Sequence, residues 1–126
     1  MPSRPLSPHL SVYKFKYTLV SSILNRFTGA ALSVGFIVLV AWIFSVANGP
    51  QAQAHLQWLL GTPPARVFLA AMVISFCYHL VAGIRHLVWD TGRGLERATS
   101  QKSAWFIGIL SVLLMLLVFY CIWAAP

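Results

Sequence analysis

The stretch VFLAAMVISFCYHLVAGIRHLVWD, residues 67–90, decides the fold that we predict for this chain. Its first 18 residues, 67–84, carry no formal charge. At about 1.5 Å of rise per residue, these residues form a helix roughly 27 Å long, close to the ~30 Å hydrocarbon core of a bilayer. The stretch therefore predicts a membrane-spanning helix, and it places His79 at membrane depth.

Four residues at helical spacing, His79, Gly83, His86 and Asp90, share one stripe of this helix about 60° wide, and Arg85 lies off it. An imidazole inside a membrane is costly without a partner, and its two ring nitrogens can serve a metal and a hydrogen-bond acceptor. The gap at Gly83 suits a flat haem lying against the helix, with its carboxylates reaching His86. The pattern fits equally well a histidine that bonds a neighbouring helix, with a glycine for close packing.

The composition excludes an ordinary soluble domain, because 59% of the 126 residues are apolar and only 9% are charged. Apolar runs predict spanning helices over residues 21–46, 65–89 and 103–123. The predicted fold is therefore an all-α, integral membrane protein with three transmembrane helices. Cys77 and Cys121 lack metal-ligand spacing, and iron–sulfur clusters usually take four cysteines, so no such cluster is expected from this chain alone.

The nine basic residues flank the apolar runs, so the net charge of +7 indicates membrane topology and does not predict nucleic-acid binding. The positive-inside rule places the amino terminus and the turn at residues 90–97 in the cytoplasm, with the connector 48–63 and the carboxyl terminus outside. We expect residues 1–20 to form a cytoplasmic arm at the membrane surface; a mobile basic tail is the alternative. We expect the connector to be a solvent-facing loop, with His55 on its surface.

A second polar stripe lies on the first predicted helix, where Ser22, Arg26, Gly29 and Ser33 fall on one face. A polar face on an apolar membrane helix needs polar groups as hydrogen-bonding partners. The pattern alone leaves open whether Arg26 serves a binding site or extends to the lipid headgroups.

Three stretches resemble the family of succinate dehydrogenase cytochrome b556 subunits. The segment that resembles the one carrying the family's axial haem histidine reads His79-x-x-x-Gly83-Ile84-Arg85-His86-Leu87-x-x-Asp90. The stretch similar to the family's first-helix motif reads Ser22-Ile23-Leu24-Asn25-Arg26-x-Thr28-Gly29. The stretch similar to its amino-terminal motif reads Arg4-Pro5-Leu6-Ser7-Pro8-His9-Leu10-x-x-Tyr13.

The resemblance implies a haem b and a ubiquinone site, with His79 as an axial iron ligand. Asn25 departs from the family pattern, which commonly has histidine there, so no haem contact is carried over to it. Haem carboxylate contacts are expected from His86, Arg26 and Arg85, and quinone contacts from Ser22, Arg26 and Asp90.

The resemblance also implies partners: a flavoprotein subunit that oxidises succinate, an iron–sulfur subunit, and a second hydrophobic anchor. The second anchor would complete a larger helical bundle and supply the other haem ligand. The chain would then be a membrane subunit of succinate:quinone oxidoreductase, without the catalytic head, and it would help to reduce ubiquinone to quinol. The alternatives are the anchor of a fumarate-reducing complex and a structural membrane protein without haem. The short amino terminus favours a bacterial inner membrane over the mitochondrial inner membrane.

Overall fold

The computed structural model describes residues 17–124, and over that range it consists of helices joined by short turns. The helices are α1 (Tyr17–Ala47), α2 (Pro50–Leu60), α3 (Pro63–Asp90) and α4 (Arg97–Ala124). Three of them, α1, α3 and α4, are long and apolar enough to cross a membrane. The predicted all-α fold with three membrane helices is confirmed. Most of the expected cytoplasmic arm lies outside the described residues.

Each membrane helix begins a few residues before the start that the sequence predicted. The helices expected from residues 21, 65 and 103 start at Tyr17, Pro63 and Arg97. Pro63 occupies the first turn of α3, where a backbone N–H would have no partner within the helix, so a proline is tolerated there. The first turns of α4 are formed by residues 97–102, which are mostly polar. In α4, apolar composition marks only the part of the helix that suits lipid, and the helix itself begins in polar sequence.

The expectation of a loop over residues 48–63 is wrong, because this connector contains α2, and His55 belongs to that helix. Pro50 stands at the start of α2, after Gly49 with a φ of 97°. The helix ends at Leu60, and the N–H of the next residue, Gly61, donates to the carbonyl of Gln57 at 2.9 Å. The polar composition of the segment reflects its exposure, while its glutamine, alanine and leucine residues favour a helix.

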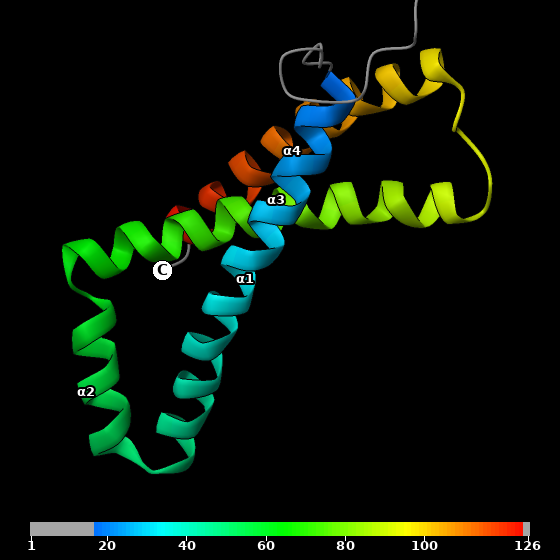
Figure 1. Cartoon of the computed structure of the whole chain (residues 1–126). Helices are drawn as coiled ribbons and strands as arrows, with labels where there is room; N and C mark the ends of the chain where they lie inside the picture. The colour runs from blue at the N-terminus through cyan, green and yellow to red at the C-terminus, as the bar shows by residue number, and fades with distance from the viewer. Residues whose placement is uncertain (1–16, 125–126) are drawn as a thin grey trace, which may run out of the picture.

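Helix α3 is the central element, packing against both α1 and α4. Figure 1 shows α1 crossing α3, with α2 joining the far end of α1 to the start of α3. The buried core is small and lies between α3 and α4, where Val81 and Ala82 meet Ile107, with Tyr78 and Leu114 packed around them. The crossing of α1 and α3 brings together the two stretches with polar stripes.

Most large apolar side chains of the spanning helices remain exposed, including Phe27, Ile37 and Phe44, each more than half accessible. A water-soluble monomer rarely exposes so much contiguous apolar surface. In a membrane protein these side chains face lipid or the helices of a partner. The orientation across the membrane stays a prediction.

Candidate functional site

His79 lies at the crossing of α3 and α1. Its Nδ1 is 3.1 Å from the backbone carbonyl oxygen of Asn25 and 3.3 Å from the hydroxyl oxygen of Thr28. A carbonyl oxygen can only accept, so this contact is a hydrogen bond when Nδ1 carries the proton. That tautomer leaves the lone pair of Nε2 free, and within residues 17–124 no hydrogen bond to Nε2 is found. In this tautomer Nε2 could act as a metal ligand.

Two glycines shape the space around this imidazole. A Cβ built on Gly29 of α1 would lie 3.0 Å from Cε1 of His79, so the absent side chain lets the ring lie against the α1 backbone. A Cβ built on Gly83, one turn after His79, would meet no atom within 4 Å. The ring is thus held on its α1 side, and open space follows it along α3.

His86 and Asp90 continue along α3 toward its end. His86 is half-buried and makes an edge-to-face contact with Trp89, with ring centroids 5.2 Å apart. Asp90 is exposed, and it has no ion pair with any of residues 17–124. Both side chains are available to groups outside this chain.

Ser22 and Arg26 lie on α1, one turn apart. Ser22 is half-buried and Arg26 is exposed. Arg26 lines a shallow pocket of about 370 Å³ together with Ile23, Phe27 and Ala30. Among the described residues, neither side chain hydrogen-bonds to His79 or His86. The expected site residues therefore fall into two groups, one at the α1–α3 crossing and one on the outer side of α1.

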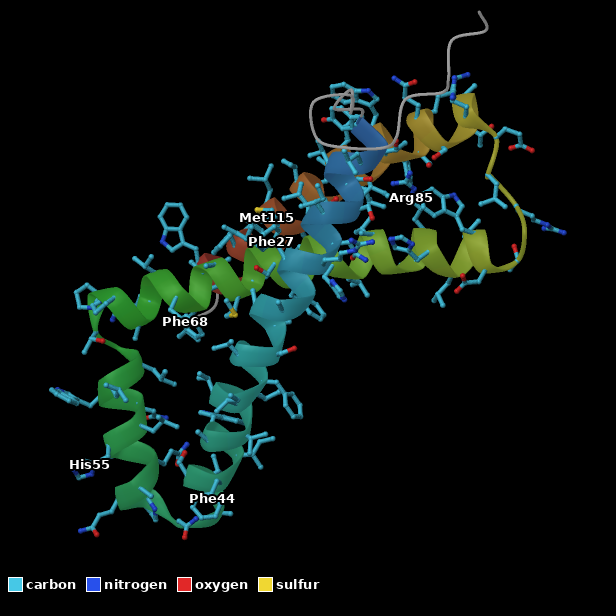
Figure 2. The ribbon with its side chains drawn as sticks, in the orientation of Figure 1. Phe27, Phe44, His55, Phe68, Arg85 and Met115 are labelled. Atoms are coloured by element: carbon cyan, nitrogen blue, oxygen red, sulfur yellow. The ribbon has the colours of Figure 1, made fainter. Side chains whose placement is uncertain are left out.

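Arg85 has a role that the sequence did not reveal. Its side chain is only 8% exposed and bonds two other helices. Nη1 donates to the hydroxyl of Ser21 at 2.9 Å, and Nη2 donates to the carbonyl and hydroxyl oxygens of Ser100 at 3.0 and 3.3 Å. Figure 2 shows Arg85 extending from α3 toward the beginnings of α1 and α4. The guanidinium thus joins the three membrane helices.

Aromatic residues complete this contact. The Arg85 guanidinium carbon lies 3.9 Å from the centre of the Trp89 ring, a cation–π geometry. The Trp89 indole N–H donates at 3.1 Å to the carbonyl of Gly94, a residue whose φ of 74° helps turn the chain into α4. The Tyr78 hydroxyl donates at 3.0 Å to the carbonyl of Ser21. Because Ser21 and Ser100 lie far from Arg85 in the sequence, helical periodicity gave no signal for the bonds that join the helices.

An apolar pocket lies away from these polar residues. It measures about 480 Å³ and is formed by apolar side chains of α1, α2 and α3, among them Phe36, Phe68 and Met72. None of the predicted site residues lines it. Residues 17–124 also contain no group of three or more histidine, cysteine, aspartate or glutamate side chains that could hold a metal ion. A metal bound to His79 would therefore need further ligands that residues 17–124 do not supply as such a group.

The sequence profile described as "Succinate dehydrogenase/Fumarate reductase transmembrane subunit" matches residues 1–118. The chain belongs to this family of transmembrane subunits. It is similar to the succinate dehydrogenase cytochrome b556 subunit of Paracoccus denitrificans, with 35% identity over 121 residues that cover 94% of this chain and 93% of that protein. The corresponding subunit of Rickettsia prowazekii is 38% identical over 114 residues, covering 90% of this chain and 89% of its own length.

A mitochondrial relative is also similar. The succinate dehydrogenase cytochrome b560 subunit of Bos taurus is 36% identical over 115 residues, which cover 88% of this chain and 67% of that protein. The relatives of this transmembrane subunit are thus named as cytochromes b of an oxidoreductase complex in both bacteria and mitochondria. Family membership confirms the resemblance found in the sequence.

Proposed function

We propose that this chain anchors a succinate dehydrogenase complex in the membrane, holds a haem b through His79, and forms part of the site where ubiquinone is reduced. The observation that carries the proposal is the hydrogen bond between Nδ1 of His79 and the Asn25 carbonyl, in a family whose relatives are named cytochromes b. With the proton on Nδ1, the lone pair of Nε2 remains free for a metal.

The residues at the α1–α3 crossing fit a haem. Nε2 of His79 offers one axial ligand, and the open space at Gly83 is a cradle that a side chain would fill. A bound haem supplies one-electron transfer, while the chain itself fixes the tautomer and orientation of the ligand. His86, the other histidine of α3, is assigned to the haem carboxylates, so a second iron ligand would come from the second anchor subunit.

Charged and polar side chains near the end of α3 would hold the haem carboxylates. His86 lies two turns from His79 and is half-buried, and Arg26 is an exposed cation on α1. Arg85 offers less, because its two Nη groups are engaged within the chain and only its buried Nε has no partner among the described residues. We therefore assign the carboxylate contacts first to His86 and Arg26.

The quinone site would use Ser22 and Arg26 on α1, with Asp90, the last residue of α3, as a further contact. A hydroxyl and a guanidinium both donate hydrogen bonds to a carbonyl oxygen. The fixed charge of Arg26 also favours the negative charge that develops on a quinone as it is reduced. The pocket of about 370 Å³ beside Arg26 offers an apolar approach for the quinone ring.

The chain would act with three partners: a flavoprotein that oxidises succinate, an iron–sulfur subunit, and a second hydrophobic anchor. The exposed apolar surfaces of α1 and α4 can accommodate the helices of the second anchor. We propose the bacterial inner membrane as the location. The relatives named above are all succinate dehydrogenase subunits, which favours succinate oxidation over fumarate reduction.

The test is purification of the complex from the native membrane in mild detergent. We expect three further subunits to co-purify, a reduced-minus-oxidised spectrum typical of a b-type cytochrome, and succinate-dependent reduction of ubiquinone. Purification of this chain without haem and without an iron–sulfur partner would contradict the proposal and favour a purely structural membrane protein.

A further inference from the structure

We propose that Thr28 is a positioning residue that holds His79 and helps set the reduction potential of the haem, an inference that rests on His79 being the ligand proposed above. The Thr28 hydroxyl oxygen lies 2.8 Å from the Leu24 carbonyl oxygen, 3.1 Å from the Asn25 carbonyl oxygen and 3.3 Å from Nδ1 of His79. The hydroxyl thus links the α1 backbone to the α3 imidazole.

The number of available protons decides whether Thr28 or His79 is the hydrogen-bond donor in the contact between them. The threonine hydroxyl has one proton, and its shortest contact is with the carbonyl of Leu24, which can only accept. The hydroxyl lone pairs then remain for Nδ1–H of His79. That proton is shared between two acceptors, the Asn25 carbonyl and the Thr28 hydroxyl.

The local sequence makes this contact rigid. The bond from the Thr28 hydroxyl to the preceding turn fixes the side-chain torsion of a residue that is already stiff at χ1. Gly29 follows at once, and its missing side chain lets the imidazole approach α1. Neighbouring residues 28 and 29 therefore supply an acceptor for the ring and the space that the ring needs.

An acceptor on the second nitrogen of a metal-bound imidazole makes that ligand more basic and fixes its orientation. A more basic ligand stabilises the oxidised iron more than the reduced iron, because the oxidised iron carries the larger positive charge. Loss of the Thr28 hydroxyl should therefore raise the reduction potential of the haem. The Asn25 carbonyl remains as an acceptor, so the haem itself should be retained.

The test is a redox titration of the haem absorbance in the purified complex, with Thr28→Val and Thr28→Ser. Valine keeps the branched shape without the hydroxyl, whereas serine keeps the hydroxyl. We expect a higher potential with valine and a value close to the original with serine. Ser33→Ala is the matched control, because the Ser33 hydroxyl also donates to a carbonyl one turn back, that of Gly29 at 3.1 Å, and makes no hydrogen bond to His79.

Thr28→Ala is a second variant without the hydroxyl, in case the valine disturbs the packing. An unchanged or lowered potential in both variants would overturn the inference, as would a serine variant that behaves like valine. These outcomes are distinct from failure of the proposed function. If His79→Ala keeps the haem spectrum, the ligand assignment fails; if His79 is the ligand and the Thr28 variants keep the original potential, only this inference fails.

Discussion

Arg85 is a charged side chain inside a bundle of membrane helices, where an unpaired charge is expensive. Its cost is offset by hydrogen bonds to Ser21 and Ser100 and by the face of Trp89. The Ser21 hydroxyl can accept from Arg85 while it donates to the carbonyl of Thr18 at 3.0 Å. The two Nη groups of Arg85 are therefore both bonded, and one guanidinium connects three helices.

Arg85→Lys should lower the thermal stability of the detergent-purified complex. A lysine keeps the charge, but its single ammonium group cannot reproduce the planar fork that bonds α1 and α4. Loss of at least one hydrogen bond to a charged donor should cost about 1.5–3 kcal/mol. Arg93→Lys, at an exposed position of the turn before α4, is the control and should leave the thermal midpoint unchanged. Equal midpoints for the two variants would show that Arg85 does not join the helices.

Arg26→Leu and Ser22→Ala should impair ubiquinone reduction and leave succinate oxidation with a soluble dye acceptor intact. A hydrogen bond from a charged donor contributes about 1.5–3 kcal/mol, which corresponds to roughly a tenfold or larger loss for Arg26→Leu. The neutral hydroxyl of Ser22 should matter less. Steady-state rates with the two acceptors give the comparison, and Arg66→Leu, an exposed arginine near the start of α3, is the control. Unchanged quinone kinetics in both variants would move the site to another subunit.

At the scale of elements, the crossing of α1 and α3 determines which side chains can meet. Gly29 allows the two helices to approach at His79, and farther along α1 a Cβ on Gly35 would lie 2.8 Å from the sulfur of Met72. Beyond this crossing the helices diverge, and α2 spans the gap between them (Figure 1). Gly29 and Gly35 thus allow α1 to approach α3 closely, whereas Gly83 leaves open space beside His79, the proposed haem ligand.

Gly83→Leu should reduce the haem content of the complex. A Cβ at Gly83 meets no atom of this chain within 4 Å. A larger side chain at this position should therefore clash only with a group from outside the chain, such as the haem. Gly108→Leu is the matched control, because a Cβ on this glycine of α4 also meets nothing within 4 Å. Haem per complex can be measured by absorbance. A full haem content in Gly83→Leu would contradict a haem at this position, and loss of the second anchor with haem retained would indicate helix packing instead.

The sequence predicted the helices that have long apolar runs. It did not predict the polar helix α2 or the side-chain contacts between helices. The three membrane helices and the stripe containing His79 follow from helical periodicity, which is a local property. Helix α2 was missed because its polar composition resembles that of a loop. The partners of Arg85 were missed because Ser21 and Ser100 lie 64 and 15 residues away in the sequence. The contact between Thr28 and His79 was missed for the same reason, since 51 residues separate them.

At the scale of the whole molecule, the chain buries few side chains and exposes long apolar surfaces. Only five hydrophobic residues are buried within the part of the chain that the structure describes, among them Cys77 and Ile107. So small a core is typical of a subunit whose remaining surface meets lipid and other helices. The proposed function requires such helices, because it assigns the second haem ligand and the catalytic head to other subunits.

The topology can be tested by labelling single cysteines with a membrane-impermeant reagent. In a background of Cys77→Ser and Cys121→Ser, we expect Gln57→Cys in α2 to react from outside the cell. Arg93→Cys, in the turn before α4, should react only after the membrane is opened, because basic residues favour the cytoplasmic side. The exposure of both positions makes them suitable for labelling. Labelling of both from the same side would exclude three spans with the amino terminus inside.

The central claim is that His79 binds the haem iron, and His79→Ala tests it most directly. The measurement is the reduced-minus-oxidised absorbance spectrum of the purified complex, with His55→Ala, an exposed histidine of α2, as the control. Because His79 offers Nε2 while Asn25 and Thr28 hold Nδ1, we predict that the cytochrome b spectrum is lost or strongly shifted in His79→Ala and unchanged in His55→Ala. An unchanged low-spin spectrum in His79→Ala would contradict the account.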